Sequence, residues 1–196
     1  SLEDVAAAGI RGPRPASPEE ALEECHELLK ESVRMRLVAD VPVGALLSGG
    51  VDSSLVVALM AAQTDQPVRT FTTRFGEPRF DEGPVAAAVS EVLGTRHTEV
   101  ALPGSAVGDL VPEMADFADE PLANPSILPT LLVCRVARQD VVVALSGDGG
   151  DELFGGYNRY RGFPRVWGMA GGVPAPLRRA LGGAMGAVAG VPGMER

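Results

Sequence analysis

The sequence predicts an α/β protein with a doubly wound, mostly parallel sheet and helices on both faces. Between residues 17 and 145, short apolar runs alternate with segments in which apolar residues recur at helical spacing. The last run, VVVAL at 141–145, is almost purely apolar, which is typical of a strand in the centre of a parallel sheet. Two runs end in Ser-Gly sequences, at residues 48 and 146, and sites in such sheets form at the carboxyl ends of strands.

The elements follow in order along the chain. Ser17, Pro18 and Glu20 have the form of a capping box, and apolar positions at helical spacing carry the first helix to about residue 39. Apolar and β-branched runs predict strands at 41–47, 68–75, 96–102 and 141–145. Helical spacing predicts further helices at 53–63, 81–93, 105–117 and 126–139.

Composition changes at both ends of this core, which we place at 17–161. Residues 1–16 are rich in Ala, Gly and Pro and lack periodicity, so we interpret them as a linker remnant. Residues 162–196 are dense in Gly, Ala and Pro, with a weak helical pattern at 176–185. We interpret this stretch as the truncated start of a carboxyl-terminal part.

Charge and composition exclude several classes of partner. A formal net charge of −9 repels a polyanion, which argues against DNA or RNA as a partner. No apolar run is long enough to span a membrane, and the first residues do not resemble a signal peptide. We therefore expect a soluble cytoplasmic protein with no membrane partner. Cys25 and Cys134 lack metal-ligand spacing and are expected to be small core residues in a reducing compartment.

The first Ser-Gly loop, SGGVDSS at 48–54, has the features of an anion site. Its glycines allow backbone amides to approach an anion, and a helix N-terminus adds unpaired donors. The lysine of a GxxxxGK[ST] loop is absent, and Asp52 would repel a phosphate unless a divalent cation stood between them. The loop therefore predicts a metal-bound polyphosphate or pyrophosphate. Small residues that only pack a strand–helix junction are the alternative.

The second loop, SGDGGDE at 146–152, repeats this pattern after the strand at 141–145. Asp148, Asp151 and Glu152 lie among glycines, and three acids on one turn are costly without a counter-charge such as magnesium. A solvent-facing acidic turn is the alternative. Two Ser-Gly-acid loops on neighbouring strands of one sheet favour a shared site.

These motifs resemble a known family. SGGVDSS is similar to the pyrophosphate loop of the ATP pyrophosphatase (PP-loop) superfamily, whose fold is adenine nucleotide alpha hydrolase-like. LSGDGGDELFGGYNRY at 145–160 resembles the signature of the synthetase domain of glutamine-hydrolysing asparagine synthetases. FDEGPVAAAVSEVLGTRHTEV and DEPLANPSILPTLLVCRVAR resemble the same family, so the likeness covers about residues 17–161.

The resemblance implies amide formation that uses ATP and Mg²⁺ as cofactors. Aspartate is activated as an acyl-adenylate with release of pyrophosphate, and ammonia from glutamine then displaces AMP. An amino-terminal glutaminase domain of the parent chain supplies the ammonia, and a homodimer is possible. We expect that domain, and a lysine that the family uses for adenylation, to lie outside these 196 residues, and the isolated chain to be inactive.

The resemblance also assigns roles to individual positions. The ATP and pyrophosphate ligands are Leu46, Ser48, Gly49, Gly50, Asp52, Ser53, Ser54, Thr73, Ser146 and Gly147. Asp52 and Asp151 are the metal ligands. Asp148 is the catalytic carboxylate, at a position where well-known members carry a glutamate needed for adenylate formation and ammonia attack, so its reach is about one methylene shorter. Arg74 replaces an expected small residue and either stacks on the nucleotide, obstructs it or points to solvent.

Other functions remain open at this point. A β-lactam-forming or peptide-cyclising synthetase would keep both loops and change the carboxylate substrate; the segment 119–129 is expected to line that side. A non-catalytic nucleotide-binding module is the alternative for the isolated chain. A tRNA-modifying relative would need a basic face, which the net charge of −9 argues against. His97, near a strand end, is expected to pack beside the site rather than to act as a base.

Overall fold

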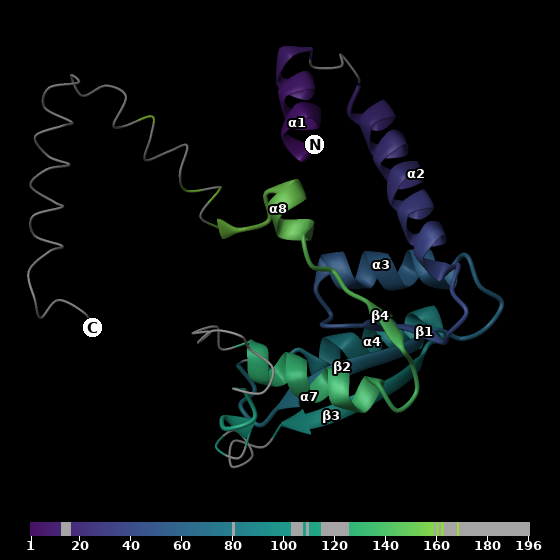
Figure 1. Cartoon of the computed structure of the whole chain (residues 1–196), viewed down its shortest axis with the longest axis vertical. Coiled ribbons are helices and arrows are strands. Elements are labelled where there is room, and N and C mark those ends of the chain that lie inside the picture. The colour runs from purple at the N-terminus through teal and green to yellow at the C-terminus, as the bar shows by residue number, and fades with distance from the viewer. Residues whose placement is uncertain are drawn as a thin grey trace, which may run out of the picture. The chain divides into compact units, whose positions relative to one another are not determined.

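The computed structural model divides the chain into two units (Figure 1). It describes residues 1–12, 17–79, 81–102, 108, 110–114, 126–158, 160, 162 and 168. The first unit comprises Ser1–Asp148 and the second Gly149–Arg196. Each unit is described by itself below.

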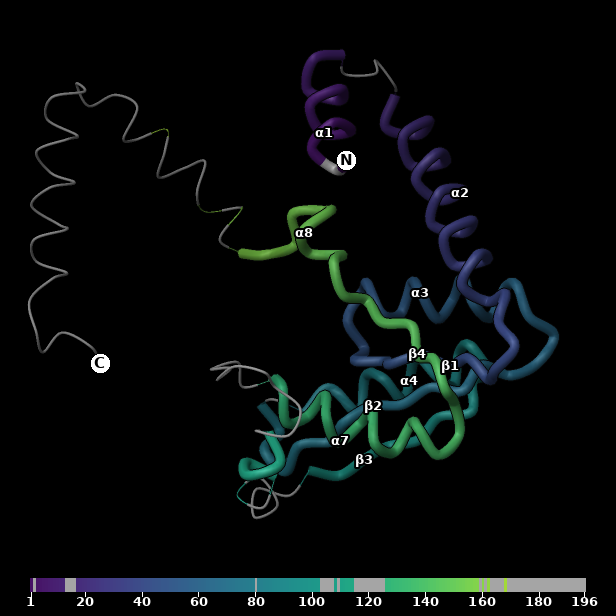
Figure 2. Tube along the Cα trace, viewed as in Figure 1, coloured from purple at the N-terminus to yellow at the C-terminus, as the bar shows by residue number. Residues whose placement is uncertain are grey.

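The first unit is built on a four-stranded parallel sheet with the order β3-β2-β1-β4. Its strands are β1 (Val43–Leu46), β2 (Arg69–Phe75), β3 (Arg96–Leu102) and β4 (Val143–Leu145). The chain proceeds outward from β1 to β3 and then returns, through α7 (Ile127–Ala137), to place β4 on the other side of β1 (Figure 2). The strand order therefore reverses between β1 and β4, and a crevice at the carboxyl ends of these strands is where such folds bind ligands.

One face of the sheet is covered by α3 (Val51–Ala61) and α4 (Gly83–Leu93). Val57 and Met60 of α3 pack with Ala45 and Leu47 into one buried cluster, which Ala86 of α4 extends. All five of these residues are almost completely buried. Removing this much apolar surface from water is the main force that holds the helices on the sheet.

The opposite face is covered by α7 (Figure 1). Val133 and Ala137 of this helix pack on Phe71 of β2 and Val100 of β3 in a second buried cluster. Because successive residues of a strand point to opposite faces, β2 contributes to both sides of the sheet. Helices on both faces of a parallel sheet confirm the predicted doubly wound fold.

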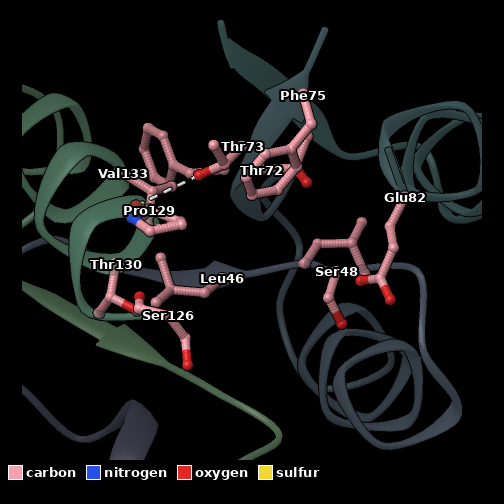
Figure 3. A pocket seen from close by; sticks show the side chains of 12 residues that line it. Leu46, Ser48, Thr72, Thr73, Phe75, Glu82, Ser126, Pro129, Thr130 and Val133 are labelled. Carbon is pink, nitrogen blue, oxygen red and sulfur yellow. Dashed lines mark hydrogen bonds between the residues drawn. The ribbon is translucent and has the colours of Figure 1, made fainter. Parts of the chain in front are cut away.

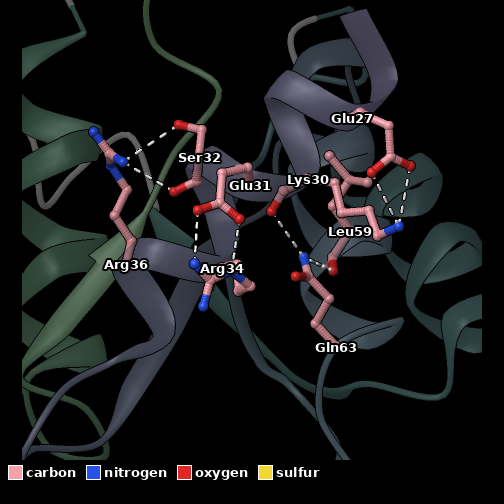
Figure 4. Close-up of polar contacts among 8 residues, drawn as sticks. All are labelled: Glu27, Lys30, Glu31, Ser32, Arg34, Arg36, Leu59 and Gln63. Atoms are coloured by element: carbon pink, nitrogen blue, oxygen red, sulfur yellow. Dashed lines mark hydrogen bonds and ion pairs between the residues drawn. The ribbon is translucent and has the colours of Figure 1, made fainter. Parts of the chain in front are cut away.

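The helix α2 (Pro18–Leu37) begins at the predicted capping box, in which Ser17 and Glu20 exchange hydrogen bonds. Its carboxyl-terminal half lies on α3, where Val33 is buried and the Gln63 side chain donates to the carbonyls of Lys30 and Leu59 (Figure 4). Its surface carries local ion pairs such as Arg34 with Glu31. The arrangement ties α2 to the same side of the sheet as α3.

Three expectations need correction. Residues 2–11, interpreted as part of an aperiodic linker, form the helix α1 (Leu2–Arg11), because Ser1 and Asp4 form a capping box. Cys134 is exposed on α7 rather than buried in a core, whereas Cys25 is partly buried. In the described sheet β4 is an edge strand and not a central one, and Val143 is 40% exposed.

Other expectations fall partly outside the described residues. Most of the helix predicted at 105–117 and all of the weak helical pattern at 176–185 lie outside the described residues. In the second unit, described residues form a short helix, α8 (Gly150–Phe154), which begins in the expected acidic turn at 146–152 and ends two residues beyond it. In that unit the Tyr157 hydroxyl donates to Glu152 at 2.6 Å. None of the described helices has the length and apolar character that crossing a membrane requires.

Candidate functional site

The loop after β1 is braced from inside by Ser53, which is only 5% exposed. The Ser53 hydroxyl accepts a hydrogen bond from the Ser48 amide at 3.2 Å and donates to the Gly50 carbonyl at 3.3 Å. The two serine hydroxyls are 2.9 Å apart, and the Gly50 amide donates to Ser48 Oγ. These bonds fix the shape of the loop before any ligand arrives.

The N-terminus of α3, which follows this loop, is free to accept an anion. Gly50 occupies the N-cap position and no side chain caps the helix. The Ser54 Oγ atom nearby is buried and has no hydrogen-bond partner among the described residues. Unpaired amides at a helix N-terminus, with the positive end of its dipole, bind phosphate groups well. These features support the anion site expected from the sequence, which stays a prediction.

Gly49 shows why this loop needs glycine. Its φ is +80°, and a Cβ atom there would lie 2.9 Å from the Ala86 amide nitrogen and 3.0 Å from Val85 Cβ. The loop is thus pressed against the first turn of α4, which leaves no space for a side chain.

The loop after β4 lies against the first loop, because β1 and β4 are paired in parallel with Ala45 opposite Leu145. A Cβ atom on Gly147 would lie 2.7 Å from the Ser53 amide nitrogen and 3.0 Å from Asp52 atoms. Asp148 is exposed, and its Oδ2 accepts a hydrogen bond from the Ser146 hydroxyl at 2.9 Å. The structure therefore brings Gly147 into direct contact with the loop after β1.

A pocket of about 740 Å³ opens beside these loops (Figure 3). Three of the predicted nucleotide residues, Leu46, Ser48 and Thr73, line it together. The other lining residues are Leu47, Phe71, Thr72, Phe75, Glu82, Ser126, Pro129, Thr130 and Val133. Its volume falls in the range of small-molecule sites, and mostly apolar walls with a few hydroxyls suit a flat aromatic base.

Several residues that line the pocket were not predicted from the sequence. Phe71 and Phe75 share a face of β2 with Thr73, so the two-residue period of a strand was a signal that could have found them. The α7 wall depends on a long-range contact, in which Thr73 Oγ1 donates to the Pro129 carbonyl at 3.3 Å. Ser126 and Pro129 lie at the end of the segment 119–129 expected on the substrate side, of which 119–125 are outside the described residues.

Arg74 does not line the pocket, because it projects from the opposite face of β2 to Thr73. Its guanidinium donates to Asp81 at 2.9–3.0 Å and to Glu99 at 2.8 Å. Hydrogen bonds to Arg74 hold the pKa of the Asp81 carboxyl below its usual value. Of the three possibilities for Arg74, the two that involve the pocket do not describe its position: it neither stacks on the pocket nor obstructs it. Its side chain is 35% exposed and is paired with the two carboxylates.

His97 also lies away from the pocket. Its Nδ1 is 2.9 Å from the Thr70 hydroxyl, which contacts the Thr95 hydroxyl at 2.9 Å. Its Nε2 is buried and lacks a partner in the part of the chain that the structure describes. Burial lowers the pKa of His97, and the charge of Glu99 acts in the opposite direction. The surroundings are those of a packed neutral imidazole.

The residues present fit a magnesium ion that arrives with a nucleotide. Across the described ranges, no group of three or more His, Cys, Asp and Glu side chains gathers to hold a metal. Mg²⁺ usually takes only one or two carboxylates together with substrate phosphates. Asp52, in the first turn of α3, has a carboxylate without a hydrogen bond or ion pair to any described residue. Asp151 lies in the second unit, so its pairing with Asp52 stays a prediction.

Comparison with known proteins identifies the family of the chain. The "Asparagine synthase" family matches residues 24–193. A "Putative asparagine synthetase [glutamine-hydrolyzing]" of Mycobacterium bovis is 42% identical over 160 residues, which are 82% of this chain and 24% of that protein. "Asparagine synthetase [glutamine-hydrolyzing] 1" of Bacillus subtilis is 37% identical over 150 residues, 76% of this chain and 24% of that protein.

The chain thus spans about a quarter of the length of these curated relatives. Among solved structures, an NMN synthetase from Francisella tularensis aligns with 74% of this chain and 60% of that chain, at a TM-score of 0.46 and 18% identity. The match at 24–193 includes both Ser-Gly loops and every residue that lines the pocket. The chain belongs to the asparagine synthase family.

Proposed function

We propose that this chain is the ATP-binding synthetase part of an asparagine synthetase. In that reaction a carboxylate oxygen of aspartate attacks the α-phosphorus of ATP, and the bond to pyrophosphate breaks. The nitrogen of ammonia, released from glutamine elsewhere in the parent protein, then attacks the acyl carbon and AMP leaves. The observation that carries the proposal is the convergence of Leu46, Ser48 and Thr73 on one pocket beside an uncapped helix N-terminus.

The adenosine part of ATP is assigned to the pocket. Leu46, Phe71 and Val133 supply apolar walls, and Thr73 is held in place by its bond to the Pro129 carbonyl. Leu46 and Phe75, at the carboxyl ends of β1 and β2, line this space, and we assign recognition of the base edge to backbone groups there. A pocket that is formed by packed strands loses little entropy when a nucleotide enters.

The β- and γ-phosphates are assigned to the loop at 48–54. The amides at the start of α3 and the buried Ser54 hydroxyl supply donors, while Ser53 holds the loop in shape. A bound Mg²⁺ would neutralise charge on the leaving pyrophosphate, and Asp52 is its proposed ligand in the first unit. Fixed donors stabilise developing charge without reorganisation during the reaction.

Asp148 is assigned to the amide-forming step. Its Oδ2 is oriented by the Ser146 hydroxyl, and Oδ1 has no hydrogen bond to another described residue. Oδ1 is therefore free to take a proton from the attacking nitrogen as the C–N bond forms. A carboxylate placed for such transfer contributes typically about 10²–10⁴-fold to a rate.

The test is exchange of labelled pyrophosphate into ATP by the full-length natural polypeptide, followed by an assay of asparagine formation. We expect aspartate to support the exchange, and Asp148→Asn to lower asparagine formation at least about 10²-fold. Asp148→Glu, which keeps the acid, should retain most of the activity. Circular dichroism of both variants should match the wild type, since Asp148 is exposed.

The same assay separates the alternatives. Exchange that depends on another carboxylic acid and not on aspartate would make the chain part of a cyclising or other amide-forming synthetase. ATP binding without exchange in the presence of any acid would leave a nucleotide-binding module. A cytoplasmic location and a homodimer remain proposals, which fractionation and light scattering of the full-length polypeptide would examine.

A further inference from the structure

Arg74 is held on the α4 side of β2 by two carboxylates from different elements. Its side chain pairs with Asp81 at 2.8 Å, just before α4, and with Glu99 of β3 at 2.8 Å. Arginine can satisfy two carboxylates at once because its guanidinium presents several donors in a fixed plane. The residue therefore links β2, β3 and the start of α4.

Asp81 is the centre of this arrangement, and its side chain is only 9% exposed. Besides the guanidinium, its Oδ1 accepts hydrogen bonds from the Phe75 amide at 3.3 Å and the Gly83 amide at 3.2 Å. The carboxylate thus joins the last residue of β2 to the first residue of α4. Removing Arg74 would leave a largely buried charge with two neutral donors only, which is costly.

The Arg74 side chain lies directly against Gly83. A Cβ atom on Gly83 would lie 1.8 Å from Arg74 Cδ and 2.2 Å from Arg74 Nε. The arginine chain therefore occupies the space of a missing side chain at the first position of α4. A side chain larger than that of glycine at position 83 would fit only if Arg74 took another path.

This cluster is adjacent to two parts of the nucleotide pocket. Glu82, between Asp81 and Gly83 in the sequence, lines the pocket together with Ser48 (Figure 3). Val85, two residues after Gly83 in the first turn of α4, lies against Gly49 of the loop at 48–54. Any shift of the first turn of α4 would move both the Glu82 wall and the support of the loop.

We propose that Arg74, with Asp81, Glu99 and Gly83, is a positioning residue that sets the start of α4 and thereby the ATP pocket. The inference rests on the proposed function, since it takes ATP to be the ligand of that pocket. Arg74 itself touches neither the pocket nor the reacting atoms. Its effect reaches the ligand through Glu82 and Gly49.

The first test compares Arg74→Met with Arg34→Met in the full-length polypeptide. Methionine keeps much of the side-chain length and removes the charge, and Arg34 is a matched control because it also donates twice to a carboxylate, Glu31, away from the pocket. We expect Arg74→Met to raise the KM for ATP and the calorimetric Kd for ATP about tenfold, with the KM for aspartate within about twofold of wild type. Arg34→Met should leave all three values unchanged.

The second test is a double-mutant cycle between positions 74 and 83. Gly83→Ala should weaken ATP binding about tenfold in the Arg74 background and have little effect in the Arg74→Gly background, because the glycine at 74 frees the space. An equal effect of Gly83→Ala in both backgrounds would overturn the pairing. ATP affinity of Arg74→Met within twofold of wild type would overturn the positioning role.

The outcomes separate this inference from the proposed function. If the wild type binds ATP and aspartate supports no exchange, the proposed reaction fails while the Arg74 effect on ATP affinity can still be measured. If the wild type is active and Arg74→Met binds ATP normally, only the positioning role fails. If the wild type binds no ATP, both fail. Circular dichroism of each variant shows whether a loss of binding comes from unfolding.

Discussion

The two Ser-Gly loops look alike in sequence but differ in how the fold holds them. The loop after β1 is closed by hydrogen bonds between Ser48, Gly50 and Ser53, and Gly49 is pressed on α4. In the loop after β4, the Ser146 hydroxyl bonds to Asp148 within an exposed turn. Gly147 is the residue of that loop that packs closely, against the start of α3.

The difference is compatible with the two different roles that we propose for the loops. A loop that must bind phosphate in one geometry gains from internal bonds that exist before the ligand arrives. A loop that presents an acid to a reacting group needs an accessible carboxylate with one oxygen oriented and the other free. Substitutions that probe the packing of each loop should therefore have graded effects on stability.

The largest effect is expected for Gly49→Ala in the first loop. The alanine would need a left-handed backbone at φ +80° and would place Cβ 2.9 Å from the Ala86 amide nitrogen. Strain and overpacking together should lower the free energy of unfolding by about 2–4 kcal/mol, measured by urea denaturation. Gly50→Ala is the control, since its Cβ would meet only Ser48 Oγ, at 3.4 Å. Equal stability of the two variants would contradict the packing described for Gly49.

An intermediate effect is expected for Gly147→Ala in the second loop. The backbone at Gly147 is unstrained, but its Cβ would lie 2.7 Å from the Ser53 amide nitrogen, and backbone atoms cannot move aside cheaply. We expect a loss of about 1–3 kcal/mol in the same denaturation experiment, with weaker ATP binding by calorimetry. Gly76→Ala is the matched control, because nothing lies within 4 Å of its Cβ. The contact between the loops is absent in solution if both variants behave alike.

The smallest effect is expected from the serines. Ser53→Ala removes the hydroxyl that braces the first loop and leaves the Ser48 amide without its acceptor. The free energy of unfolding should fall by about 1–2 kcal/mol, and that of Ser146→Ala should stay within about 0.5 kcal/mol of wild type. Urea denaturation of the pair measures the difference directly. A larger loss for Ser146→Ala than for Ser53→Ala would reverse the comparison between the loops.

Much of the sheet was predictable because its signals are local. The alternating run at 96–102 coincides with β3, and the run at 68–75 differs from β2 by one residue. Ser48, at the Ser-Gly turn after β1, lines the pocket that we propose as the site. The helix α1 was missed because its capping box at Ser1 and Asp4 stands before an alanine-rich stretch with few large apolar residues.

The pocket was less predictable, since its walls come from distant parts of the chain. Leu46 and Thr73 were predicted from the family resemblance, but Thr130 and Val133 reach the pocket only because α7 packs on β2. Arg74 could not be placed at all, because its direction depends on Asp81 and on Glu99. Strand alternation gives the face on which a side chain lies and cannot give its ion-pair partners.

The pairing of β1 with β4 has a consequence for how the protein is made. Gly44 lies in register with Ala144, so a ribosome must synthesise β2, α4, β3 and α7 before this edge of β1 is covered. Until then the nascent chain exposes an unpaired strand edge next to an apolar core, a state prone to association with other chains. The crevice between the two loops therefore forms only after β4 has been synthesised, and chaperones that hold nascent chains would meet it open before then.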